Sequence, residues 1–275
     1  MTDSSWPETV LASWKDFNDL VLENHIRLVK PHQRSYWYRG QSKSEWSLDS
    51  AFTRFCRKLS IDRDLAYSLE GRALEIFQNR AHLYLSPHLL PPGSNILSWW
   101  TLMQHYRAPT RVLDWTLSPL VALYFTVKEN WDEDGALWSF HPTKLNILSD
   151  KQYGELPDFN EGPSGDFLFN PNPPPRIIAF GYNRSTDRMV AQQGTFSACV
   201  DPLLDHAEGI AGILPPNEVC DEGKSLLIFR NKFVVAAKAK PEFLRRLHHM
   251  NITVASLFPG IDGLGQEIEE IIRMS

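Results

Sequence analysis

The sequence predicts an α+β fold, in which a helix-rich N-terminal half packs on a mixed or antiparallel sheet formed mainly by the C-terminal half. Segments with apolar residues at helical spacing dominate the first half of the chain, and segments rich in β-branched and aromatic residues dominate the second. The chain has no internal repeat, and its 275 residues suit one compact domain with insertions. We therefore expect a single domain over residues 1–275.

The N-terminal half contains four predicted helices and one strand. Ser118-Pro119 combines a capping serine with proline at a first helical position, and Pro109 ends the helix before it. The segment "SYWYRGQ" is rich in β-forming residues and reaches a glycine near its end. The predicted elements are helices at 7–28, 62–85, 95–107 and 118–129 and a strand at 35–41.

The C-terminal half contains most of the predicted strands. A Pro-, Gly-, Asn- and Asp-rich segment at 151–175 predicts a long surface loop or lid rather than a second core. The segment "DRMVAQQG", 187–194, predicts a helix that closes on a glycine cap. The other predicted elements are strands at 135–141, 176–181, 194–200, 225–230 and 233–239 and helices at 240–250 and 262–274.

Composition and targeting signals narrow the class of protein. The net charge of −5 argues against a protein that coats nucleic acid, although it leaves room for a local basic cleft. Three cysteines, Cys56, Cys199 and Cys220, lack the spacing of a disulfide framework or a zinc site. The sequence has neither a signal peptide nor an apolar stretch of membrane-spanning length. We expect a cytoplasmic protein with no membrane partner and no metal site.

Arg39, in "WYRGQ", is the first candidate site residue. An arginine at the end of a strand presents a planar fork that suits phosphate or carboxylate. Gly40 lets a ligand or another backbone approach closely. A surface arginine in a hairpin turn is the alternative interpretation.

The stretch "MQHYRAPTRVLDWTLSPLVALYF", 103–125, carries the densest group of polar side chains in the sequence. His105, Arg111 and Asp114 stand directly before an apolar helix. Asp114 can pair with Arg111 or His105 in a buried network, or it can orient a catalytic histidine. Residue chemistry alone leaves these two interpretations equal, because buried polar networks also fix packing.

Two later segments add weaker candidates. Gln192 and Gln193 stand at a helix-to-strand corner, where a side-chain amide can hydrogen-bond a ligand. The segment "SLFPGIDGLGQEIEE", 256–270, has glycines that allow close approach, and its acidic end is typical of a solvated helix turn. Phosphate-loop, GxGxxG, HExxH and GxSxG signatures are absent from the sequence.

Together these segments resemble the FRG domain family of bacterial and phage-related proteins. That family is named for an aromatic-Arg-Gly motif, here Tyr38-Arg39-Gly40. "HYRAPTRVLDWT" is similar to its second signature, HYGxPTRLLDWT, with Arg107 in place of the usual glycine. A cation there is expected to narrow the cleft or add a ligand contact. "QQGTF" and "LFPGIDGL" are similar to later family elements, so the resemblance runs from about residue 36 to about residue 265.

The resemblance implies a shared polar site, although the family is essentially one of unknown biochemical function. Its setting among mobile elements and defence systems implies an effector or toxin-like role, with a protein partner or inhibitor. Residues 103–116 are expected to form one wall of a cleft whose opposite wall carries Arg39. The implied catalytic residues are His105 and Asp114, and the implied ligand- or phosphate-binding residues are Tyr38, Arg39, Tyr106, Thr110, Arg111, Trp115 and Gln193.

Three functions remain open at this point. The first is an enzyme acting on a nucleotide, with NAD as one candidate substrate and no certain cofactor. Arg39 is similar to the first motif of one ADP-ribosyltransferase class, but no strand-borne Q/E-x-E glutamate is evident. The second is a single-stranded nucleic-acid binding or cleaving module, in which Asp114 and Asp262 hold Mg²⁺. The third is a protein-interaction module without catalysis.

Overall fold

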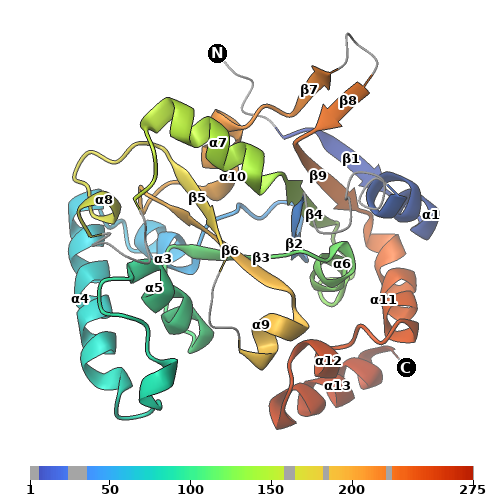
Figure 1. The fold of residues 1–275 in the computed structure, drawn as a ribbon. Helices are drawn as coiled ribbons and strands as arrows, with labels where there is room; N and C mark the ends of the chain where they lie inside the picture. The colour runs from blue at the N-terminus through green and yellow to red at the C-terminus, as the bar shows by residue number, and fades with distance from the viewer. Residues whose placement is uncertain (1–5, 24–35, 158–164, 182–185, 221–224, 275) are drawn as a thin grey trace.

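A mixed seven-stranded sheet forms the centre of the protein, and helices pack on both of its faces (Figure 1). The structure is a computed structural model that describes residues 6–23, 36–157, 165–181, 186–220 and 225–274. The strands follow the order β1-β9-β4-β2-β3-β6-β5 across the sheet. They span Glu8–Leu11 (β1), Trp37–Gln41 (β2), Val112–Thr116 (β3), Gly135–Phe140 (β4), Ile177–Phe180 (β5), Gly194–Cys199 (β6) and Arg230–Val235 (β9).

The strand directions confirm an α+β fold with a mixed sheet. β1 runs parallel to β9, and the other neighbouring pairs in this sheet are antiparallel. Strands β1 to β4 precede residue 141, so the sheet draws on both halves of the chain. A second, two-stranded sheet pairs β7 (Asn217–Cys220) with β8 (Ser225–Ile228).

β2 and β3 are neighbours at the centre of the large sheet, but they pair at one position. Tyr38 lies opposite Thr116, whereas β2 pairs with β4 over five positions and β3 pairs with β6 over five positions. The two strands therefore diverge beyond this single pair. We call the divergence between residues 37–41 and 112–116 the central seam, because residues on both of its sides form the candidate site.

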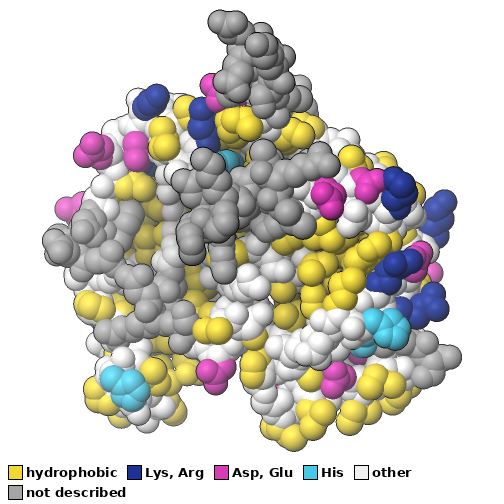
Figure 2. Space-filling view, turned by 45° about the vertical axis from the view of Figure 1, so that its right-hand side comes forward, with side chains coloured by type: hydrophobic (Ala, Val, Ile, Leu, Met, Phe, Trp, Pro, Cys, Tyr) yellow, Lys and Arg dark blue, Asp and Glu magenta, His cyan; other side chains and the backbone are white. Residues whose placement is uncertain are grey.

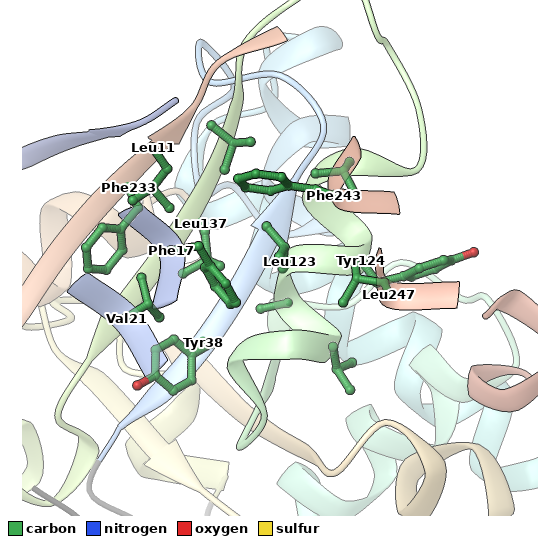
Figure 3. Packing of buried hydrophobic residues seen from close by; sticks show 14 of the residues in the cluster. Leu11, Phe17, Val21, Tyr38, Leu123, Tyr124, Leu137, Phe233, Phe243 and Leu247 are labelled. Carbon is green, nitrogen blue, oxygen red and sulfur yellow. The ribbon is translucent and has the colours of Figure 1, made fainter. Parts of the chain in front are cut away.

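One face of the sheet is covered by α6 (Pro119–Val127), α11 (Lys240–His249) and the short α1 (Trp14–Phe17). Figure 3 shows the core between them, in which Tyr38, Leu123 and Phe243 take part. α6 begins at Ser118, whose hydroxyl accepts a hydrogen bond from the Val121 N–H. Seven of its nine residues are buried, which confirms the predicted apolar helix as an element of the core.

The opposite face is covered by α7 (Pro142–Tyr153) and α10 (His206–Ile213), which enclose Leu113 and Trp115. Beside β3, α4 (Arg63–Ala81) and α5 (Ile96–His105) build a third cluster that includes Val112 and Phe196. The remaining helices are η1 (Asn18–Leu22), α3 (Ala51–Lys58), η2 (Pro87–Leu89), α8 (Gly165–Leu168), α9 (Asp187–Ala191), η4 (Ala237–Ala239), α12 (Val254–Leu257) and α13 (Ile261–Met274). Among the described helices, none combines the length and apolarity that a bilayer crossing requires.

The predicted helix at 7–28 is wrong over its first part. Residues Glu8–Leu11 form the edge strand β1, and the first helix begins at Trp14, after a capping box formed by Ser13 and Asp16. The segment "ETVL" contains two β-branched residues, and β9 pairs with it along its whole length. Strand pairing with β9 therefore outweighs the helical spacing of the apolar residues in this segment. Residues 24–28 lie outside the described residues.

Most other predicted elements are confirmed within a few residues. They are 35–41 (β2, with residue 35 outside the described residues), 62–85 (α4), 95–107 (α5), 118–129 (α6), 135–141 (β4), 176–181 (β5), 187–194 (α9), 194–200 (β6), 225–230 (β8), 233–239 (β9, then η4), 240–250 (α11) and 262–274 (α13). The sequence analysis did not predict α3, η2, β3, α7, α10, β7 or α12. The predicted loop at 151–175 begins inside α7 and contains α8, and residues 158–164 lie outside the described part of the chain.

Candidate functional site

Arg39 reaches across the central seam and contacts β3. Its Nη1 donates a hydrogen bond to the carbonyl oxygen of Asp114 at 2.7 Å, where the parted strands have no ladder pair. Its buried Nε has no hydrogen-bond partner among the described residues. Burial lowers the pKa of the guanidinium, the charge of Asp114 opposes that shift, and the nearby Arg54 adds to it. Within the described part of the chain, Arg39 is thus a cation fixed by a backbone carbonyl, and no carboxylate is bound to it.

Gly40 brings β2 and α6 into direct backbone contact. A Cβ at this position would lie 1.9 Å from the carbonyl oxygen of Ala122 and 2.7 Å from the Thr126 N–H nitrogen. The expectation of a close backbone approach at Gly40 is therefore met by α6. The contact also sets the distance between β2 and the end of α6, where Phe125 and Lys128 lie.

Arg39 lines a hollow of about 440 Å³, which we call the Arg39 pocket. Its charged groups are three cations, Arg39, Arg54 and Lys128, and one carboxylate, Glu129, which pairs with Lys128 at 2.9 Å. Trp46, whose side chain is 45% exposed, supplies an accessible aromatic surface. The full lining consists of Arg39, Gly40, Gln41, Ser42, Trp46, Ser47, Arg54, Phe125, Lys128 and Glu129.

Asp114 lines a second, smaller hollow of about 80 Å³, the Asp114 pocket. The Asp114 carboxylate accepts a hydrogen bond from Gln104 Nε2 at 2.6 Å, and Thr110 Oγ1 donates to Gln104 Oε1 at 2.9 Å. Gln104 thus holds Asp114 in place. The pocket is lined by Thr101, Gln104, His105, Asp114, Trp115, Arg188, Met189, Gln192, Gly194 and Phe196.

His105 lies in the Asp114 pocket but is not oriented by Asp114. The carboxylate bonds to Gln104, and His105 has no hydrogen-bond partner among the described residues. Burial, together with the charge of Arg188, lowers the pKa of His105, so the imidazole is neutral at pH 7. The guanidinium of Arg188 lies over the ring of Phe258 at 4.6 Å, and Asp114 partly offsets the fall that burial causes in its pKa. A neutral histidine, a carboxylate and a cation therefore share one small pocket.

Arg111 was predicted to bind a ligand, but the structure encloses it completely. The side chain forms a two-pronged ion pair with Glu70, and Nη1 donates to the carbonyl oxygens of Leu168 (3.0 Å) and Val200 (2.6 Å). The aromatic rings of Tyr67, Trp100 and Phe169 surround the guanidinium. Every face of Arg111 is occupied by the protein itself, so it stabilises the fold and leaves no room for phosphate.

Three other predicted ligand residues are also buried. Tyr38 packs under α6 in the core, and Thr110 is 1% exposed, with its hydroxyl bound to Gln104. Trp115 packs edge-on against Phe140, and its Nε1 donates to Ser197 Oγ at 2.7 Å on the opposite face of the sheet from Asp114. Strand alternation explains this, because neighbouring residues of β3 point to opposite faces. These side chains are almost wholly buried, although Trp115 still borders the Asp114 pocket.

Tyr106 and Gln193 lie near the site but outside both pockets. Tyr106 is half exposed and lines an apolar hollow of about 310 Å³ with Ile76, Phe77 and Tyr84. Gln193 is exposed with a φ of 48°, and its carbonyl oxygen accepts from the Leu117 N–H at 3.1 Å. The helix cap predicted at Gly194 thus falls one residue earlier. Gln192, not Gln193, lines the Asp114 pocket, and its amide donates to the Leu257 carbonyl at 3.0 Å.

Arg107 occupies a backbone position that suits glycine. Its φ is 65°, in the left-handed region. The Arg107 N–H donates to the Gln104 carbonyl at 2.9 Å and the Ala108 N–H to the Met103 carbonyl at 2.9 Å, which is the Schellman pattern at the end of α5. The glycine usual in the resembling family is explained by this cap. Arg107 lines neither the Arg39 pocket nor the Asp114 pocket.

Several functional candidates escaped the sequence reading. Trp46, Arg54 and Lys128 line the Arg39 pocket, and Gln104 and Arg188 line the Asp114 pocket. Arg54 lies on α3, a helix that the sequence did not predict. Of these residues, only Gln104 could have been identified as a site residue from the sequence, because it directly precedes the His-Tyr pair of the main motif.

The described residues show neither a cluster of metal ligands nor a free glutamate of α13 beside Asp114. Within the described ranges no group of three or more His, Cys, Asp or Glu side chains is arranged to hold a metal ion. Of the glutamates in α13, Glu270 is buried and bonded to the Tyr124 hydroxyl at 3.0 Å and to His248 at 3.1 Å. Glu270 therefore serves the packing of α13.

Comparison with known proteins identifies the family of this region. A family profile described as the FRG domain matches residues 34–135, from the segment before β2 to the first residue of β4. No curated protein and no solved structure matches the chain. The matched segment contains Arg39, Gly40 and the whole stretch from Gln104 to Asp114, which are the residues that build the central seam. The chain therefore contains an FRG domain, which the profile matches over residues 34–135.

Proposed function

We propose that this FRG domain is a nucleotide-directed enzyme that binds its substrate by a phosphate group in the Arg39 pocket. The observation that carries the proposal is the state of Arg39 itself. Its guanidinium is fixed by one backbone carbonyl, it has no carboxylate partner among the described residues, and it lines an open hollow. An arginine held in this way is prepared for an anionic group.

The other groups of the Arg39 pocket support the same ligand class. Arg54 and Lys128 add positive charge, whereas Glu129 is the single carboxylate in the lining. Trp46 is half exposed and offers a surface on which a base can stack. The volume of about 440 Å³ falls within the usual range of small-molecule sites. Phosphate-binding cations beside an accessible aromatic ring favour a nucleotide over a simple anion.

The Asp114 pocket, which shares no lining residue with the Arg39 pocket, supplies the groups to which we assign the chemistry. A histidine that is neutral at pH 7 can accept a proton, and the Asp114 carboxylate can stabilise a developing positive charge. NAD is the candidate substrate that uses both the histidine and the carboxylate, since cleavage of its bond to nicotinamide develops positive charge on the ribose. Asp114 lies on strand β3, and we assign it the electrostatic part that a strand-borne glutamate plays in ADP-ribosyltransferases.

The experiment measures binding and turnover separately. Titration calorimetry with ATP, AMP, NAD and inorganic phosphate is performed on the wild type, Arg39→Met and Arg39→Lys. Arg245→Met is the matched control, because Arg245 is an exposed arginine on α11 outside both pockets. Chromatography of the NAD mixture detects released nicotinamide.

We expect Arg39→Met to weaken nucleotide binding about 10- to 100-fold, as for loss of a charged hydrogen bond, and Arg245→Met to change nothing. Arg39→Lys keeps the charge but loses the planar fork, so its nucleotide affinity should lie between those of the wild type and Arg39→Met. Equal affinity of wild type and Arg39→Met for every ligand would sink the binding proposal. Binding without nicotinamide release would leave a nucleotide-binding domain and reject NAD cleavage.

The placement of the aromatic residues disfavours single-stranded nucleic acid as the ligand. Trp37, Tyr38 and Trp115 lie in the core, and Arg57 is paired with Asp49. On the face drawn in Figure 2, Lys and Arg side chains gather mainly along one edge, and outside the grey atoms no continuous basic band crosses it. These arginine and aromatic side chains therefore do not form one continuous surface stripe. An effector or toxin-like role in the cytoplasm stays an expectation drawn from the family resemblance.

A further inference from the structure

Lys240, the first residue of α11, is a fully buried cation bound only by backbone carbonyls. Its Nζ donates to the carbonyl oxygens of Ser42 at 2.6 Å, Asn130 at 2.8 Å and Glu129 at 3.4 Å. An ammonium has three N–H groups, so these three acceptors satisfy it completely. No carboxylate lies within ion-pair distance of Nζ among the described residues.

Two of the three carbonyls, those of Ser42 and Glu129, belong to residues on different walls of the Arg39 pocket, and Asn130 directly follows Glu129. Ser42 begins the loop 42–47, which contributes Trp46 and Ser47, and Glu129 follows the C-terminal end of α6, which contributes Phe125 and Lys128. The end of a helix carries partial negative charge, which favours a cation there. Lys240 therefore joins the loop 42–47 to α6 from behind the pocket.

A second contact joins the same two walls. Asn130 Nδ2 donates to Ser42 Oγ at 2.8 Å, and the Ser44 N–H donates to the Asp134 carbonyl at 2.7 Å. Asn130 has a φ of 52°, a conformation that asparagine tolerates and glycine adopts freely. Lys240 is thus the charged centre of a small junction made otherwise of neutral hydrogen bonds.

We propose that Lys240 is a positioning residue of the Arg39 pocket, whose ammonium holds the loop 42–47 against α6 and so fixes Trp46 relative to Arg39. The inference rests on the proposed function, since the pocket matters only if a nucleotide binds there. It assigns to Lys240 a role beyond filling the core, because two of its three acceptors, Ser42 and Glu129, line the pocket and the third, Asn130, directly follows Glu129.

The charge of Lys240 makes this device sensitive to pH. Burial lowers its pKa to about 8, Asp134 and Glu133 oppose that shift, and Lys43 adds to it. Glu133 is itself paired with Lys43 at 2.6 Å, and Asp134 Oδ1 accepts from the Ala237 N–H at 2.8 Å. Above about pH 8 the ammonium loses a proton and one of its three N–H donors. The hold on the loop 42–47 then weakens while the phosphates of ATP stay ionised.

The test compares Lys240→Met with Arg176→Met in the full chain. Arg176 is another fully buried cation, bonded to the Gly154 carbonyl at 2.9 Å and to Asp150, at the far edge of the sheet beside β5. Asn130→Gly is a milder variant of the same junction, because it deletes the bond to Ser42 and keeps the backbone conformation. Hydrogen exchange of the loop 42–47 and ATP affinity from pH 7 to pH 9.5 are measured on each.

We expect Lys240→Met to raise exchange in the loop 42–47 and to weaken ATP binding about tenfold, with Asn130→Gly between it and the wild type. Arg176→Met should lower overall stability without either effect. Wild-type affinity should fall as the pH rises through about 8, and Lys240→Met should lose that dependence. Equal exchange and affinity in Lys240→Met and Arg176→Met would overturn the inference. If ATP, AMP and NAD bind no form of the protein, the proposed function fails, and hydrogen exchange alone then decides whether Lys240 holds the loop.

Discussion

Arg39 and Asp114 are joined across the central seam by a hydrogen bond from Nη1 to a main-chain carbonyl, not to the carboxylate. The Asp114 side chain remains available on the other side of the strand, where Gln104 holds it. The two most polar residues of the site are thus in contact while each faces its own pocket. This arrangement allows the binding and chemical roles to be separated by substitution.

Asp114→Asn should leave the fold and the ATP affinity nearly unchanged, but it should abolish the release of nicotinamide from NAD. An asparagine oxygen can still accept the hydrogen bond from Gln104, and the carbonyl that holds Arg39 is retained. Urea unfolding should differ from wild type by less than about 1 kcal/mol, a value typical of one hydrogen bond. A large loss of ATP affinity would show instead that the carboxylate is needed to keep Arg39 in place.

Arg111→Met should destabilise the protein strongly by leaving Glu70 buried without its partner. Loss of one member of a buried ion pair costs about 3–5 kcal/mol. Arg63→Met, which breaks the more exposed pair with Asp201, should cost less than about 1 kcal/mol. Chemical denaturation measures both. A small effect at Arg111, with nucleotide affinity lost, would restore the earlier view of Arg111 as a ligand residue.

Gly40→Ala should be among the most damaging single-methyl additions in the chain. The added Cβ would lie 1.9 Å from the Ala122 carbonyl oxygen, so β2 and α6 must separate. We expect a loss of at least about 3 kcal/mol in the free energy of unfolding, as in severe overpacking. Gly93→Ala is the control, because a Cβ there meets nothing within 4 Å. Equal melting temperatures for the two variants would contradict the packing described here.

Arg107→Gly should stabilise the protein by about 1 kcal/mol, because it removes a side chain from a left-handed backbone position. Arg107→Ala is the matched control, since it deletes the same charge but keeps the unfavourable φ. Thermal unfolding of both variants separates charge from backbone strain. Stabilisation by alanine as large as that by glycine would assign the effect to charge.

His206 should make the protein less stable as the pH falls below about 6.5. Burial lowers its folded-state pKa to about 3, so in this interval the unfolded chain binds a proton that the folded chain does not. This single group can cost up to about 1.4 kcal/mol per pH unit. His206→Gln should flatten the slope between pH 6.5 and pH 4 in urea unfolding, whereas His249→Gln, at an exposed position, should leave it unchanged.

Local signals predicted the elements that are strongly marked in the sequence. Ser118-Pro119 indicated the start of α6, and the β-forming residues of "SYWYRGQ" indicated β2. The segment 112–116 was not predicted as a strand, because its charged and aromatic residues were interpreted as a site. The edge strand β1 was missed for another reason, since only its partner β9 makes "ETVL" extended.

The candidate site was predicted in outline but not in its members. Arg39 and Asp114 meet at the central seam, but they line separate pockets, so the structure does not form the expected single cleft with Arg39 on the wall opposite residues 103–116. The sequence did not show which polar side chains are enclosed by the protein. Arg111 and Asp114 lie only three positions apart, yet Arg111 is fully buried against Glu70 and Asp114 lines a pocket. Trp46 and Lys128 could not be predicted, because tertiary packing alone brings them to Arg39.

The alternation of β2 directs three consecutive residues to two different faces of the sheet. Tyr38 and Gly40 face the α6 side, while Arg39 lies opposite Trp138 and turns to the other. A slip of one position in strand register would exchange these directions, and it would drive the guanidinium into the Ala122 backbone. Correct pairing of β2 with β4 during folding is therefore also the step that assembles the Arg39 pocket, so a misregistered molecule could not be compact and keep that pocket.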